Sequence, residues 1–100
     1  MFSDTEEGFF RTQIPMVHMF PSGFPVSRSE ARRLCEMIGK FKEAILDFTD
    51  IDDIGQAFAH ELFVLWQKRN PDIKLTVVNA NDNVDFMIKR AIRTAENQAQ

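Results

Sequence analysis

A short apolar segment stands between two amphipathic helical patterns, and this alternation constrains the fold more than any other feature. The segment Glu43–Phe48 is nearly all apolar and is bounded by charge, as expected of a central strand covered on both faces. Helical spacing of apolar residues precedes it in residues 28–38 and follows it in residues 54–69. Strands joined through helices should be parallel, with right-handed crossovers.

The first helix has a clear start and stop in the sequence. Ser27 and Glu30 form a capping box, in which each side chain can bond the backbone of the other residue. One buried stripe then follows, made of Ala31, Leu34, Cys35 and Ile38. Gly39 is the expected end of this helix.

The second helix is predicted over residues 54–69, with Asp53 as its N-cap. Its apolar arc consists of Phe58, Ala59, Leu62, Leu65 and Trp66, and Phe63 and Val64 fall outside that arc. A strand is predicted over Ile73–Val78, followed by a turn over Asn79–Asn83 and a last helix with Val84 on its buried stripe.

Prolines punctuate the N-terminal part and argue against a helix there. Phe9–Ile14 and Met16–Phe20 are predicted as short strands, residues 21–23 as a turn and Phe24–Val26 as another short strand. The expected fold is therefore a small α/β sandwich with a mixed sheet of about four to five strands and three helices. The element order is strand, strand, helix, strand, helix, strand, helix. Residues 9–96 form a single domain, after a flexible acidic lead-in (1–8) and before a frayed tail (97–100).

Composition narrows the function classes. A chain of 100 residues is one domain, and 12 basic against 15 acidic residues give a net charge of −3, which argues against nucleic-acid binding by bulk charge. The single cysteine, Cys35, excludes an internal disulfide and a cysteine-rich zinc site. Neither a signal peptide nor a membrane-spanning run is visible, so a cytoplasmic protein without membrane partners is expected.

Several short motifs lie along the chain, namely Val26–Leu34, Phe41-Lys42-Glu43, Leu46-Asp47-Phe48, Ile54–Glu61 and Asn79-Ala80-Asn81. Together they resemble the family of small STAS-like domains of unknown function. The resemblance covers most of the chain, from about residue 24 to residue 92. Members of that family occur alone or attached to histidine-kinase-type ATPase domains, so the resemblance implies a regulatory binding module rather than an enzyme.

The resemblance also raises the question of a phosphorylation switch. In the better-known STAS domains of anti-sigma-factor antagonists, a partner kinase phosphorylates a serine at a helix start. Asp53 and Gly55 match that frame, but Ile54 stands at the serine position. The classical switch is therefore not carried over, and nothing marks nearby Thr49 as a substitute.

Parallel strands bring the following helix starts to one edge of the sheet, where open α/β sheets bind ligands. We therefore expect a partner- or ligand-binding surface there, formed by Arg28, Asp53, Gly55, Gln56 and Asn81, with Phe63 and Trp66 as apolar contacts. Caps and turns are the structural alternative for these polar residues. The preferred function is docking of a protein partner or of a second copy onto the second helix and the sheet edge at its start.

Other chemistry finds less support. The runner-up is a ligand- or nucleotide-sensing module at the same helix starts, and a third reading is nucleic-acid binding through Arg28, Arg32 and Arg33. The acidic residues between 47 and 53 lack a phosphate-binding loop, so no metal site is assigned. His60-Glu61 lacks the second histidine of a zinc-protease helix. No catalytic residue and no cofactor are assigned.

The ten phenylalanines are numerous for a domain of this size, and four of them find no place in the predicted core. These four are Phe9, Phe10, Phe63 and Phe86. A partner or homodimer surface is where we expect them.

Overall fold

The computed structural model describes residues 10–20 and 25–98. The elements are β1 (Arg11–Pro15), α2 (Met16–Met19), α3 (Arg28–Ile38), β2 (Glu43–Asp47), α4 (Gln56–His60), the π-helical segment η1 (Glu61–Trp66), α5 (Gln67–Arg69), β3 (Lys74–Val78) and α6 (Asp82–Gln98). Because α4, η1 and α5 follow one another without a break, residues 56–69 form one continuous helix, the second helix below. The predicted α/β fold is confirmed.

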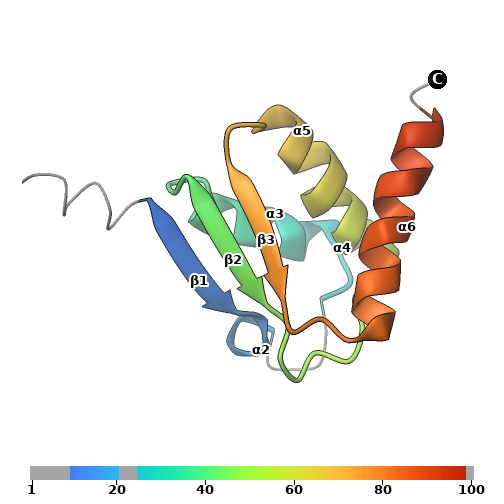
Figure 1. The fold of residues 1–100 in the computed structure, drawn as a ribbon, viewed down its shortest axis with the longest axis horizontal. Coiled ribbons are helices and arrows are strands. Elements are labelled where there is room, and N and C mark those ends of the chain that lie inside the picture. Colours follow the sequence, from blue (N-terminus) through green and yellow to red (C-terminus); the bar gives the residue numbers. More distant parts are fainter. Residues whose placement is uncertain (1–9, 21–24, 99–100) are drawn as a thin grey trace, which may run out of the picture.

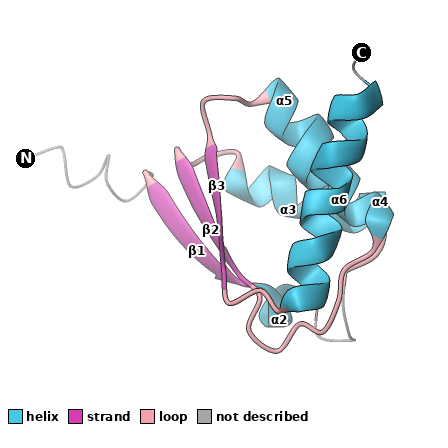
Figure 2. Ribbon diagram, turned by 45° about the vertical axis from the view of Figure 1, so that its right-hand side comes forward, coloured by secondary structure: helices cyan, strands magenta, loops and turns pink. Residues whose placement is uncertain are grey.

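The sheet contains three parallel strands in the order β1-β2-β3 (Figure 1). Arg11 lies opposite Glu43, which lies opposite Lys74. Both crossovers step in the same direction across the sheet, so two right-handed connections place their helices on the same face. Figure 2 shows this layering, with α3, α4, α5 and α6 all on one side of the strands.

The central strand is therefore covered on one face, and the prediction of two covered faces is wrong. Ala44 and Leu46 are fully buried against the helices. Glu43, Ile45 and Asp47, which alternate with them, are only half-buried. An uninterrupted apolar run indicated a strand correctly, but it did not reveal that the crossovers leave the second face bare.

The strand predicted over Met16–Phe20 is also wrong, because Met16–Met19 is a single helical turn. Pro15 is its N-cap, and Pro21 follows Phe20 in the sequence. Proline disrupts the interior of a helix but is compatible with the positions around its start, so one turn fits between the two prolines. Pro25 and Val26 are not in a strand, and Phe24 lies outside the described residues. The described residues thus contain three strands, not four or five.

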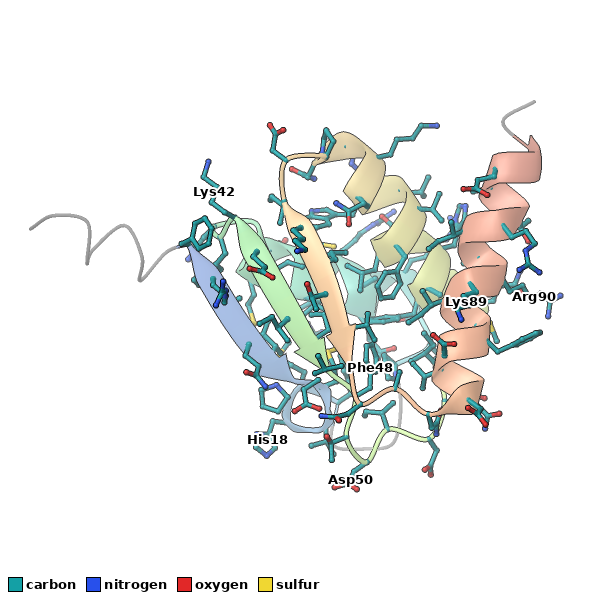
Figure 3. All side chains as sticks on the ribbon, in the orientation of Figure 1. His18, Lys42, Phe48, Asp50, Lys89 and Arg90 are labelled. Atoms are coloured by element: carbon teal, nitrogen blue, oxygen red, sulfur yellow. The ribbon has the colours of Figure 1, made fainter. Side chains whose placement is uncertain are left out.

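The core lies between the sheet and the helices. Phe20, at the end of α2, packs its ring edge-to-face on Phe58 of the second helix, with centroids 5.6 Å apart. The predicted stripe of α3 is buried as expected, and so is the arc of the second helix apart from Leu65. Figure 3 places Phe48, which is 1% exposed, just after the end of β2, and Asp50 further out in the following loop.

Three predictions concern the ends and turns of the chain. The predicted lead-in over residues 1–8 and the turn over residues 21–23 lie outside the described residues. The last helix reaches Gln98, and residues 99–100 again lie outside.

Candidate functional site

The starts of α3 and of the second helix lie side by side. The predicted capping box is present: Ser27 Oγ accepts from the Glu30 N–H at 3.2 Å, and Glu30 Oε1 accepts from the Ser27 N–H at 2.9 Å. The Gly55 N–H donates to the carbonyl oxygen of Pro25 at 2.8 Å, which joins the two helix starts. The prediction that these two helix starts lie close together is confirmed.

Two predicted site residues, Arg28 and Gln56, meet at a cavity of about 440 Å³. Each is the first residue of its helix and is exposed. The side-chain amide of Gln56 makes no hydrogen bond to any described residue. Ala57, His60 and Thr94 complete the lining. This cavity is the part of the predicted edge that the structure assembles.

Gly55 has a packing role. It is the N-cap of the second helix, in place of the predicted Asp53, and its backbone is extended (φ −79°, ψ 154°). A Cβ atom on Gly55 would lie 2.6 Å from Val26 Cα and 2.7 Å from the Val26 carbonyl oxygen. Glycine is therefore required because two backbones approach closely. Asp53 Oδ1 instead accepts from the N–H of Ile54 at 2.8 Å.

Asn81 caps α6 and ties it to the loop before the second helix. Its Oδ1 accepts from the Val84 N–H at 2.8 Å, and its Nδ2 donates to the Asp52 carbonyl oxygen at 3.0 Å. Thr94 lies thirteen residues further along α6, about 20 Å at the helical rise per residue. Asn81 therefore does not join Arg28 and Gln56, and its structural role as a cap accounts for it.

A polar network occupies the carboxyl end of the sheet. Asp47 Oδ1 accepts from the Thr49 hydroxyl at 2.6 Å and from Asn79 Nδ2 at 3.1 Å, which links the ends of β2 and β3. The hydroxyl of Thr49 and the amide of Asn79 lower the pKa of Asp47. Within the described residues, no group of three His, Cys, Asp or Glu side chains is placed to hold a metal ion. The network reads as a structural link between two strand ends.

The two residues predicted as apolar contacts on the second helix have different surroundings. Phe63 is half-buried and lines a cavity of about 350 Å³ between the second helix and α6. Trp66 is only 7% exposed and belongs to the core, so we leave it out of any docking surface. The other phenylalanines without a core position behave as expected where they are described, since Phe10 is 48% exposed and Phe86 is 61% exposed.

Glu61 is a residue whose importance sequence reasoning missed. It is only 3% exposed and lies 3.6 Å from Arg32 Nε and 3.7 Å from Arg69 Nη2. Glu61 is the first residue of the π-helical segment, in which the backbone hydrogen bonds join residues five positions apart. Trp66, five positions further on, lines the same cavity as Glu61. A 3.6-residue period does not reveal this placement, although a glutamate beside the apolar run Leu62–Trp66 was a visible signal.

Ile54, at the position of the phosphorylated serine in classical STAS domains, is 1% exposed. It is therefore a core residue. No described helix is both long enough and apolar enough to cross a membrane.

The sequence was compared with known families, proteins and structures. Searches of curated proteins and of solved structures give no match. A family model described as a STAS-like domain of unknown function matches residues 30–85, which run from the capping box of α3 into the first turn of α6. More than half of the chain lies within this match, and it contains β2, the second helix and β3. The chain therefore belongs to the family of STAS-like domains of unknown function.

Proposed function

We propose that this chain is a non-enzymatic regulatory module that docks a protein partner in the groove between its second helix and α6. The observation that supports this best is the composition of the groove, where Phe63, Val64, Ile92 and Ala95 supply apolar surface. Ile92 is 38% exposed and lies beside the half-buried Phe63 and Val64, so the apolar surface of the groove is continuous. An apolar centre accompanied by polar side chains is typical of protein interfaces.

The shape of the groove favours an amphipathic helix as the docked segment. Two helices form its walls, and such grooves accept the apolar face of a third helix. Lys68 and Glu96 line the groove as well, so a partner helix with one acidic and one basic residue beside its apolar stripe would match it. The family resemblance suggests a histidine-kinase-type ATPase as the source of this helix, in a cytoplasmic signalling complex. A second copy of the chain is the competing occupant.

The test is a quantitative pull-down from host lysate with matched variants. Ile92→Asp places a charge in the groove, whereas Phe86→Asp places the same charge on an exposed phenylalanine that does not line it. We expect Ile92→Asp and Phe63→Asp to lose the same captured proteins, and Phe86→Asp to keep them. The purified captured protein should then bind the folded Ile92→Asp variant at least about tenfold more weakly, which is an ordinary cost for a charge in an apolar contact.

Two outcomes would contradict the proposal. If the folded groove variants capture the same proteins as the unmodified chain, the groove is not the docking surface. If the unmodified chain and Phe86→Asp sediment as dimers whereas Ile92→Asp and Phe63→Asp are monomeric, the occupant is a second copy. Circular dichroism verifies that each variant is folded.

The second candidate function is sensing of a small phosphorylated ligand at the Arg28–Gln56 cavity. An exposed arginine, an amide without a partner and His60 surround about 440 Å³ beside two helix starts, a setting that suits anions. Calorimetry with a panel of nucleotides tests it, with Arg28→Ala/Gln56→Ala as the variant. Absence of heat with every phosphate compound would eliminate this candidate. Binding that the variant leaves unchanged would place the ligand elsewhere.

The nucleic-acid alternative is weakened by the surroundings of Arg32. This arginine lines a different cavity from Arg28, so the two do not form one continuous basic surface. A mobility-shift assay at low salt would have to show salt-dependent binding to revive this reading.

A further inference from the structure

A buried carboxylate lies at the base of a cavity on the flank of the second helix that faces α3. Glu61 is 3% exposed, and its carboxylate makes no hydrogen bond to any described side chain or backbone group. It lines a cavity of about 290 Å³ together with Arg32, Arg69, Cys35, Glu36 and Trp66. A buried carboxylate is costly unless a positive charge compensates it, and here two arginines do so.

The two arginines come from different elements and approach the same carboxylate oxygen. Arg32 Nε of α3 lies 3.6 Å from Glu61 Oε2, and Arg69 Nη2 of α5 lies 3.7 Å from the same oxygen. Both distances are too long for hydrogen bonds, so these are ion pairs only. A guanidinium has five N–H donors, and neither guanidinium makes a hydrogen bond to any described residue. Because their side chains are 66% and 60% exposed, most of these donors are available to a ligand.

The hydrogen-bond donors around the cavity favour an anion over a cation. Two guanidinium groups face a single carboxylate oxygen, so N–H donors remain unused beside Glu61, although two arginines and two glutamates give the lining no net formal charge. Burial, reinforced by the Glu61 carboxylate, raises the pKa of Cys35 to about 12, which keeps its thiol neutral. Glu36 is exposed and adds the remaining negative charge to the lining.

We propose that Arg32 and Arg69 form a binding site for an oxyanion, either a phosphate or a carboxylate group, and that Glu61 is the positioning residue that holds them together. Arginine binds these planar or tetrahedral oxyanions through two parallel N–H groups. The site lies on the α3 flank of the second helix, whereas the docking groove lies on the α6 flank, so neither proposal depends on the other.

Trp66 provides a specific signal for the test, because it is the only tryptophan in the sequence and lines this cavity. The indole N–H resonance and the backbone resonances of Arg32 and Arg69 are followed during titration with inorganic phosphate at constant ionic strength. A saturable shift confined to this cavity is expected. Arg32→Ala/Arg69→Ala should weaken binding by about tenfold or more, since two charge-assisted bonds are lost.

Two controls keep the test decisive. Arg33→Ala/Arg93→Ala removes the same charge from two exposed arginines that do not line this cavity, and should change the affinity by less than about twofold. Removing both arginines leaves Glu61 buried without a cation, so the alanine double variant can lose stability. Arg32→Lys/Arg69→Lys retains the charge and should still bind several-fold more weakly, because the guanidinium fork is lost.

The role of Glu61 is tested by a matched pair of glutamate variants. Glu61→Gln and Glu36→Gln each remove one negative charge from the same cavity. Charge alone predicts tighter phosphate binding in both, whereas a positioning role predicts weaker binding in Glu61→Gln and tighter binding in Glu36→Gln. Tighter binding in both variants would refute the positioning role.

The remaining arms identify the source of the oxyanion. The same titration with acetate and with a phosphoserine peptide separates a carboxylate from a phosphate and a free ion from a modified protein. The site itself is disproved if none of the three probes gives a saturable shift, or if Arg33→Ala/Arg93→Ala weakens binding as much as the variant of the site arginines.

Discussion

The backbone N–H of Gly55 donates to the carbonyl oxygen of Pro25 at 2.8 Å, so the start of the second helix leans on the segment that leads into α3. This contact leaves no room for a side chain, because a Cβ atom on Gly55 would meet the Val26 backbone at 2.6 Å. Gly55→Ala should therefore lower the free energy of unfolding by about 3 kcal/mol, as expected when a packed site is overfilled. Urea denaturation measures the change.

Gly39→Ala is the matched control for this glycine. Gly39 has a right-handed helical backbone (φ −64°, ψ −13°), and a Cβ atom there would meet only the Cys35 carbonyl oxygen, at 3.2 Å. The free energy of unfolding should change by less than about 1 kcal/mol, because alanine adopts this backbone freely. Equal losses for both variants would show that the approach of Val26 to Gly55 is not the cause.

The Asn81 side chain should contribute about 1–2 kcal/mol to the free energy of unfolding, since it caps α6 and binds the loop carbonyl of Asp52. Asn81→Ala removes both contacts, and thermal denaturation should show a lower melting temperature. Asn83→Ala provides the control, because the Asn83 side chain is exposed and makes no hydrogen bond to any described residue. An Asn81→Ala protein as stable as the unmodified chain would mean that the cap contributes nothing.

The capping box of α3 predicts a specific acid sensitivity. The backbone N–H groups of Ser27 and Val26 hold the pKa of Glu30 below its ordinary value. A carboxyl group with a lowered folded pKa stabilises the fold above its unfolded pKa, about 4.3, and this stabilisation is lost as the pH falls through the folded pKa. Glu30→Gln can still accept the bonds, so stability measured below about pH 4.5 should fall less steeply with pH.

Glu36→Gln is the control for this titration, because Glu36 lies on the same helix and its carboxylate makes no hydrogen bond to any described residue. The prediction fails if the two variants have the same acid dependence. Ser27→Ala should independently lower the free energy of unfolding by about 1 kcal/mol, and Ser29→Ala is the control variant on the same helix.

The Cys35 thiol should be inert in the folded protein. Burial, followed by the nearby Glu61 carboxylate, raises its pKa to about 12, so hardly any thiolate exists at pH 8. The reaction with a chromogenic disulfide reagent should be slow at first and become fast only in denaturant. Because the raised pKa favours the folded state below the ordinary thiol pKa, stability should decline as the pH rises beyond about 8.5. Rapid labelling of the folded chain would contradict the burial of this residue.

Local signals in the sequence were sufficient for the elements with strong caps and periodicity. Ser27, Glu30 and the stripe from Ala31 to Ile38 specified α3 almost to the residue, because capping and amphipathicity act within one helix. The turn at Met16–Met19 could not be predicted, since a four-residue segment is too short to show a period. Which faces of β2 are covered depends on the direction of both crossovers, and that is a property of the whole topology.

The candidate site was predictable only in part, for a similar reason. The meeting of Arg28 and Gln56 followed from parallel strands and their helix starts. The pairing of Glu61 with Arg32 and Arg69 depends on how the π-helical segment packs beside α3, and no spacing in the sequence encodes it.

The strand order has a consequence for how the chain reaches its native state. Paired residues such as Arg11 and Glu43, or Glu43 and Lys74, are 32 and 31 positions apart in the chain (43 − 11 and 74 − 43). All three described strands pair in parallel and none forms a hairpin with another, so the ends of a segment of about thirty residues must meet before either ladder can form. Folding rates fall as such separations grow. This domain should consequently fold more slowly than a helical bundle of the same length.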